Sequence, residues 1–91
     1  MGTEGDGMSV EETLKERGSR YGDFSQHAEI AQDLQDAMRK NPRWGRLNPI
    51  HKQALTVIAD KIARIVSGDP DYADNWHDIQ GYAKLVEDRL P

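Results

Sequence analysis

The chain has no cysteine, few aromatic residues and no long hydrophobic run, and these absences exclude several classes of protein. Without cysteine, neither a disulfide framework nor a zinc site with thiolate ligands can form, which fits a reducing compartment. No apolar run approaches the ~20 residues of a membrane-spanning helix. The N-terminus also lacks the basic and apolar segments of a signal peptide. We therefore expect a cytoplasmic protein without a membrane partner.

The charge balance is acidic, with 12 basic and 16 acidic residues and a net charge of −4 at pH 7. A general nucleic-acid binder normally carries a dominant basic face, so this composition argues against general nucleic-acid binding. It leaves room for a local basic pocket that takes a small phosphate-bearing ligand. With 91 residues, the chain makes one small domain with limited apolar burial. We expect it to complete its core by forming a homo-oligomer.

The spacing of apolar residues predicts an all-α fold, a small four-helix domain built on an antiparallel helical hairpin. One short N-terminal helix precedes three longer ones. Residues 1–8 are expected to form a disordered lead and residues 9–91 a single helical domain. Ser9 and Glu12 predict a capping box at the first helix, and Gly18 is expected to end it. Ser25 is the expected cap of the second helix, which runs to about residue 40, and Asn48 that of the third.

The hairpin spans residues 57–82 and contains most of the strong apolar residues. The third helix carries an aliphatic stripe at steps of three, four and three, which is expected to lie in the core: Leu55, Ile58, Ile62 and Ile65. A second stripe follows in the fourth helix: Trp76, Ile79, Tyr82 and Val86. Gly68 suits the left-handed position that closes a helix, and Pro70 prevents its continuation.

Charged side chains flank both stripes. Asp60 and Arg64 are four residues apart in the order that favours a surface ion pair, and a solvated face explains them as well as a site does. In an antiparallel hairpin, Asp78 approaches Lys61 or Arg64, and such a pair would fix the register of the two helices. Asp74 and Asp78 lie one turn apart and suggest a Mg²⁺ site, although aspartates also collect at helix N-termini without a metal.

Two glycines bracket Arg20 and Tyr21 in the segment 18–24, which predicts a tight loop. In one interpretation the loop is a connector, with Tyr21 and Phe24 folded onto the core. In the other, Arg20 and Tyr21 present a cation and a ring to a ligand that carries a phosphate and a base. Trp44 has the same two interpretations, closing the end of the helical domain or stacking on a base.

Three blocks of the sequence carry a resemblance: ERGSRYGDF (residues 16–24), DKIARI (60–65) and GDPDYADNWHDIQGYAKL (68–85). In this order they resemble a small family of proteins from tailed phages and prophages. A K-x-x-R-I helix followed by a D-x-x-x-Y-A helix is more distantly similar to phage nucleotide-modification-associated proteins. The all-α nucleotide pyrophosphohydrolases of the MazG type are a looser analogy.

MazG-type enzymes bind Mg²⁺ with an ExxE helix followed by an ExxD helix. This chain has Asp33-x-x-Asp36 and Asp74-x-x-x-Asp78 in their place, which differ in residue type and, for the second pair, in spacing. Shorter carboxylates at altered spacing move the ligand oxygens, and metal catalysis tolerates such shifts poorly. No catalytic role is therefore transferred to this chain, and no metal ligand is assigned.

The resemblance and the residues together suggest a phage-type accessory protein in the host cytoplasm that binds a nucleotide or a related phosphate-bearing small molecule, with sequestration of a host defence signal as one role. The expected ligand contacts are Arg20, Tyr21, Lys61, Arg64, His77 and Asp78. This interpretation requires no cofactor and favours a non-enzyme. One alternative is a divergent Mg²⁺-dependent MazG-like nucleotide pyrophosphohydrolase that uses Asp60, Asp74 and Asp78. Another is a protein-binding inhibitor of a host factor.

Overall fold

The computed structural model describes residues 9–91, and the predicted N-terminal lead lies outside them. The helices are α1 (Val10–Tyr21), α2 (Phe24–Arg39), α3 (Pro49–Ser67) and α4 (Ala73–Glu87), with a 3₁₀ turn η1 (Trp44–Arg46) before α3. No strand occurs between residues 9 and 91. The predicted all-α fold is therefore confirmed, with α1 the shortest of the four helices at 12 residues.

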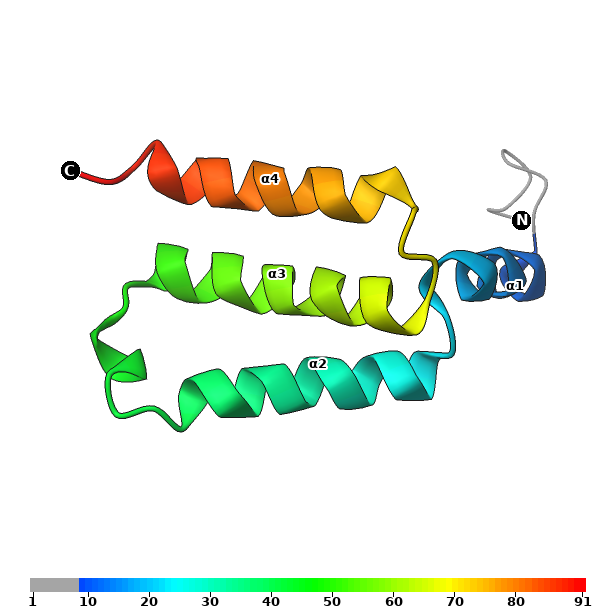
Figure 1. Ribbon diagram of the computed structural model, residues 1–91, viewed down its shortest axis with the longest axis horizontal. Coiled ribbons are helices and arrows are strands. Elements are labelled where there is room, and N and C mark those ends of the chain that lie inside the picture. The colour runs from blue at the N-terminus through cyan, green and yellow to red at the C-terminus, as the bar shows by residue number, and fades with distance from the viewer. Residues whose placement is uncertain (1–8) are drawn as a thin grey trace.

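Helix α3 is the centre of the fold. It packs against both α2 and α4, which run antiparallel to it on its two sides, while α1 extends from one end (Figure 1). The helices α2, α3 and α4 thus form a single layer. Because no second layer covers them within the part of the chain that the structure describes, both faces of the layer are open to solvent there.

Small residues form the seams of this layer. Ala31 of α2 and Ala59 and Ala63 of α3 are buried, as is Ala54 nearer the start of α3, and Ala63 is 0% exposed. Alanine at a helix contact lets two backbones approach closely, since no long side chain holds them apart. The core of the described domain is therefore made of short side chains between helices.

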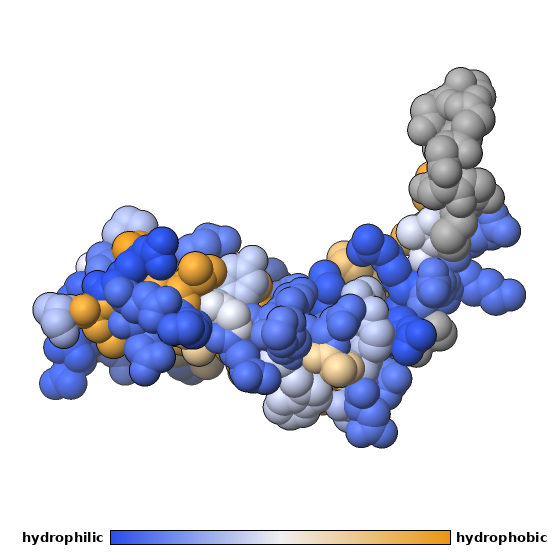
Figure 2. Space-filling view, turned by 90° about the horizontal axis from the view of Figure 1, so that it is seen from above, coloured by the Kyte–Doolittle hydropathy of each residue, from blue (hydrophilic) through white to orange (hydrophobic). Residues whose placement is uncertain are grey.

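The predicted aliphatic core of α3 is wrong in part. Ile58 and Ile65 are half-buried, but Leu55 and Ile62 are exposed, Ile62 at 39%. In α4, Trp76 is also exposed. The reason is that α2 packs on the alanine side of α3, which leaves Leu55 and Ile62 on an uncovered face of the layer. Figure 2 looks down from the α4 side and shows hydrophobic side chains gathered at the left-hand end, where α3 begins and α4 ends.

The helix starts follow local capping signals. The Ser9 side chain accepts from the Glu12 amide and the Glu12 carboxylate accepts from the Ser9 amide, as predicted. Asn48 caps α3 by accepting from the backbone N–H of His51, also as predicted. The cap of α2 is Asp23 and not Ser25, because the Asp23 carboxylate accepts both the Gln26 amide and the Ser25 hydroxyl.

Helix α1 continues through Gly18, which was expected to end it. Gly22 ends it instead, with φ of 82° and its N–H donating to the Gly18 carbonyl at 2.9 Å. This φ lies in a region that glycine adopts easily and other residues rarely do. The continuous helix places Arg17 and Tyr21 one turn apart on the same side of α1.

The α1–α2 corner and the α3–α4 turn are in direct backbone contact. The Asp69 amide donates to the Arg20 carbonyl at 2.8 Å, and the Ser67 hydroxyl donates to the Tyr21 carbonyl at 3.1 Å. A Cβ on Gly22 would lie 1.7 Å from the Ser67 carbonyl oxygen, and one on Gly68 would lie 2.3 Å from the Tyr21 carbonyl carbon. Gly68 was expected in the left-handed conformation, but its φ is −127°. Glycine is required at position 68 because the backbone of Tyr21 approaches it too closely for a Cβ atom.

The position of Trp44 and the length of the helices test two further expectations from the sequence. Trp44 is half-buried in η1, at the end of the layer away from α1, where Lys52 Nζ lies 5.9 Å from the centre of its ring (Figure 1). It therefore takes no part in the loop around Tyr21. Among residues 9–91, no helix has the combination of length and apolarity needed to cross a bilayer.

Candidate functional site

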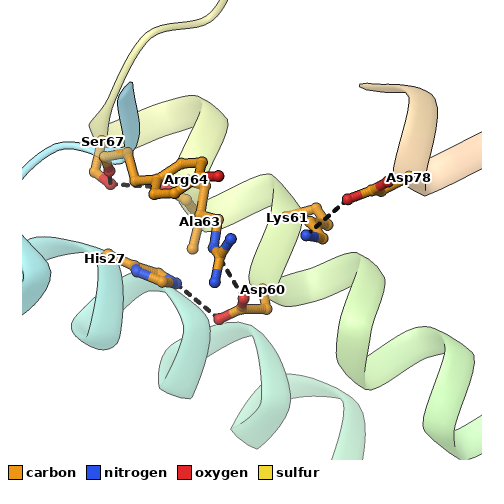
Figure 3. A network of polar contacts seen from close by, with 8 residues as sticks. His27, Asp60, Lys61, Ala63, Arg64, Ser67 and Asp78 are labelled. Carbon is orange, nitrogen blue, oxygen red and sulfur yellow. Dashed lines mark hydrogen bonds and ion pairs between the residues drawn. The ribbon is translucent and has the colours of Figure 1, made fainter. Parts of the chain in front are cut away.

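A polar network joins α2 to α3 near the place where the α1–α2 corner touches the α3–α4 turn (Figure 3). His27 Nε2 lies 2.7 Å from Asp60 Oδ1, and the other oxygen of Asp60 lies 3.2 Å from Arg64 Nε. His27 is 8% exposed, so its contact with Asp60 is largely shielded from water. Asp60 thus holds a buried imidazole from α2 and a guanidinium from its own helix.

Arg64 is held from a second direction by Tyr21. Its Cζ atom lies 4.5 Å from the centre of the Tyr21 ring, which is the geometry of a cation–π contact. The buried Nε pairs with Asp60 by charge but makes no hydrogen bond, and among the side chains that the structure describes none is seen to accept a hydrogen bond from the terminal nitrogens. The guanidinium is therefore oriented, yet most of its donor capacity is unused.

A cavity of about 540 Å³ opens beside this guanidinium. It lies between α1, the start of α2 and the last turns of α3. Its lining residues are Leu14, Arg17, Gly18, Tyr21, Gly22, Asp23, Phe24, His27 and Arg64. Two arginines thus meet an aromatic ring that is unusually open to solvent, since Phe24 is 77% exposed.

Asp23 is the carboxylate among the lining residues of this cavity. Its side chain already accepts hydrogen bonds from two groups of α2. The Ser25 hydroxyl and, to a smaller extent, the Gln26 amide hold the pKa of the Asp23 carboxyl below its usual value. The group is therefore ionised at neutral pH and committed to capping α2. Asp23 therefore brings a negative charge to a lining that also carries two cations, Arg17 and Arg64.

The six predicted contact residues do not converge. Tyr21 and Arg64 line the cavity. Arg20 points to a different ring, with its Cζ 4.7 Å from the centre of Tyr72. Lys61 pairs with Asp78 between α3 and α4 at 2.9 Å, and His77 is exposed on α4.

The pair between Lys61 and Asp78 confirms the expectation that Asp78 would approach a cation of α3. The Lys61 ammonium donates to the Asp78 carboxylate and adds its charge, which together lower the pKa of that carboxyl. The contact joins the C-terminal half of α3 to the second turn of α4, and its predicted effect on the register of the hairpin stays a prediction.

The three carboxylates considered for Mg²⁺ do not meet. Asp60 binds His27 and Arg64, and Asp78 binds Lys61. Asp74 accepts from the Tyr72 hydroxyl at 2.9 Å, and this bond raises the pKa of Tyr72. Within residues 9–91, no three potential ligands among His, Asp and Glu come together.

Only Tyr21 and Arg64 of the lining were predicted as ligand contacts, and Arg17, Phe24 and His27 are among those that sequence reasoning missed. Arg17 was overlooked because Gly18 was taken as the end of the helix, whereas a continuous helix puts Arg17 one turn from Tyr21. His27 was not selected as a site residue from the sequence, but it faces α3 and lies 2.7 Å from Asp60. Its spacing of four from Ala31 would have placed it on the buried side.

The fold and the cavity define a small all-α protein with an arginine-lined pocket at one end of a single helical layer. The chain belongs to the family DUF6378, described as a domain of unknown function, whose model matches residues 9–90. No curated protein and no solved structure matches the chain.

Proposed function

We propose that this protein binds a nucleotide or a related phosphate-bearing small molecule in the cavity between α1, α2 and α3. The observation that carries the proposal is the state of Arg64, which Asp60 and Tyr21 orient while its terminal nitrogens stay free at the cavity wall. A planar guanidinium matches two phosphate oxygens at once, and a pre-oriented one loses less entropy on binding.

The roles in this pocket divide between cations and rings. Arg64 and Arg17 contact the phosphate, because they are the two cations of the lining. Phe24 offers its ring to the base, since one face of Tyr21 is already covered by the guanidinium of Arg64. A cavity of about 540 Å³ is within the usual range of small-molecule sites, roughly 300–1,000 Å³.

The biological setting we propose is that of a phage accessory protein in the host cytoplasm, acting by holding its ligand rather than by converting it. The carboxylates that a hydrolase would use are engaged with Lys61, with Tyr72, or with His27 and Arg64. Sequestration of a nucleotide-like host signal is a role that requires binding alone. A second copy of the chain is the protein partner we expect.

The test is a thermal-shift and calorimetric screen of nucleoside mono-, di- and triphosphates and cyclic nucleotides, with and without Mg²⁺. At 100 times its dissociation constant, a ligand adds about 2.7 kcal/mol to the unfolding free energy. For a nucleotide that binds, Arg64→Gln should weaken affinity roughly ten- to hundred-fold, the value of a charge-assisted bond. The matched control is Arg39→Gln, which removes an exposed arginine at the end of α2.

Several outcomes would contradict the proposal. One is a screen in which no nucleotide stabilises the protein, and another is an equal loss of affinity in the Arg39 and Arg64 variants. A third is steady release of pyrophosphate or phosphate when the protein is incubated with Mg²⁺ and a triphosphate, abolished by EDTA. That result would favour the pyrophosphohydrolase.

Phe24→Ala should weaken nucleotide binding by more than it weakens binding of inorganic phosphate, because only the nucleotide has a base to stack on the ring.

A further inference from the structure

One face of the helical layer carries an exposed aliphatic stripe. Leu55, Ile62 and Val66 are all exposed on α3, and they lie within about 40° of one another around the helix at 100° per residue. A groove of about 350 Å³ continues this face along the seam with α4. It is lined by Leu47, His51, Ala54, Leu55, Ile58, Ala83 and Val86. We call this surface, with Ile65 at its edge, the stripe face.

The stripe face lies opposite the proposed ligand cavity. Arg64, which lines the cavity, is about 160° around α3 from Ile62 and about 180° from Leu55. On α4, the exposed Trp76 stands seven residues before Ala83 and so lies on the same side as the groove. Whatever covers the stripe face therefore leaves the cavity accessible.

The spacing of the stripe is symmetric, which identifies its occupant. Leu55, Ile58, Ile62 and Ile65 are separated by three, four and three residues, the a/d pattern by which helices pair. A second copy rotated by 180° about the middle of the stripe places Leu55 opposite Ile65 and Ile58 opposite Ile62. The same surface is thus complementary to itself, as the interface of a two-fold dimer must be.

Size and charge agree with this occupant. Helix α3 has 19 residues and is about 28 Å long. Two helices side by side are about 20 Å wide, so the α3–α4 pair presents a flat area of roughly 560 Å², to which the relief of the side chains adds. A standard interface buries about 800 Å² of accessible surface per partner. In the antiparallel arrangement, the start of α3, which carries Lys52, lies at the same end of the dimer as the α3–α4 turn of the second copy, which carries Asp69.

We infer that the protein is a homodimer in which the stripe faces of two copies pack with their α3 helices antiparallel. The two α3–α4 hairpins then form a four-helix arrangement, and the apolar side chains that a single layer leaves in water become its centre. Each copy keeps its own cavity on the outer side. The inference does not depend on the proposed ligand.

The first experiment measures mass by light scattering after size exclusion at 10–100 µM, with circular dichroism to confirm folding. Wild-type protein should have the mass of two 10.3 kDa chains. Ile62→Lys should have the mass of one. The matched control is Ile50→Lys, since Ile50 is 44% exposed but lies about 140° around α3 from Leu55, and this variant should remain a dimer. A wild-type monomer would overturn the inference, as would a control that dissociates while Ile62→Lys does not.

A second experiment keeps the inference testable if Ile62→Lys does not fold. The chain has no cysteine, so Ile58→Cys and Ile62→Cys each introduce a single thiol. After the two variants are mixed, equilibrated and oxidised, the antiparallel arrangement should yield mainly the mixed disulfide. Predominant linkage of each variant to itself would overturn that arrangement, because parallel helices would place position 58 opposite 58 and position 62 opposite 62.

Discussion

The two ends of α3 are built in different ways. At its C-terminal end, the α1–α2 corner and the α3–α4 turn touch backbone to backbone, and the His27–Asp60–Arg64 network lies just below them. We call this the interlocked end. At its N-terminal end, two apolar grooves of about 340 and 350 Å³ flank the seam where Ala54 meets Val86. We call this the open end.

The difference teaches where each property of the molecule comes from. Hydrogen bonds and close backbone contacts are directional, so the interlocked end has one well-defined geometry that can hold a guanidinium ready for a ligand. Apolar contact is non-directional and depends on area removed from water. The open end and the adjoining stripe face would therefore gain stability from any well-fitting apolar cover, and in the dimer we propose a second copy of the chain is that cover.

The largest effect on stability should come from adding a side chain at Gly22, where the α1–α2 corner touches the α3–α4 turn. Gly22→Ala would place a methyl group 1.7 Å from the Ser67 carbonyl oxygen, at a φ of 82° that alanine rarely adopts. We expect a loss of about 3 kcal/mol or more in the free energy of unfolding, measured by urea denaturation. Such a loss is a large share of the stability of a small domain.

The matched control for this prediction is Gly81→Ala, in the middle of α4, where an added Cβ meets no atom within 4 Å. It should raise stability by about 0.5–1 kcal/mol, because alanine is the better helix former. If Gly22→Ala proved as stable as wild type, the interlocked end would be no tighter than the rest of the fold.

The sequence predicted the helices well because their signals are local. The Ser9 capping box, the Asn48 cap and the halt of α3 at Ser67 depend on a few neighbouring residues. The burial of Ile62 was predicted wrongly for a different reason. Helix α3 has both an aliphatic stripe and an alanine stripe. Which of the two is covered depends on how α2 packs against α3, and the residues of α3 alone do not determine that.

The candidate site was predicted in part for the same reason. Tyr21 and Arg64 stood out by residue type, and both line the cavity. Lys61 stood out equally but pairs with Asp78 of α4, since it lies about 60° around α3 from Arg64. Arg17 depended on whether α1 passes through Gly18, and a glycine alone does not determine that, because the cost of one in a helix is only about 1 kcal/mol.

A middle-sized effect should follow from Asp60→Asn, which removes charge from the network at the interlocked end while keeping its shape. His27 and Arg64 would each lose a charged partner, and Asp60 is half-buried, so we expect a loss of about 1–3 kcal/mol. Lys84→Ala breaks an exposed pair with Asp88 near the end of α4 and should cost only about 0.5 kcal/mol or less. Equal losses in the two variants would contradict the distinction between the ends.

The smallest effect concerns Asp78, which joins α4 to α3 midway between the two ends. Its pKa is lowered by the Lys61 ammonium, first through the hydrogen bond and then through charge. A lowered folded pKa stabilises the fold fully above the pKa of the unfolded carboxyl, about 4, and this contribution is lost as the pH falls through the folded value. Removing Lys61 should therefore make the free energy of unfolding fall less as the pH is lowered below about 4.

The measurement is an NMR titration of the Asp78 carboxyl in wild type and in Lys61→Met. The pKa of Asp78 should rise toward its usual value in the variant. Glu12 provides an internal reference, because its pKa is lowered by the Ser9 amide and hydroxyl in the capping box of α1, which Lys61 does not touch. A variant in which Glu12 and Asp78 both keep their lowered pKa would mean that Lys61 is not the cause, and that the hairpin register is held by apolar packing alone.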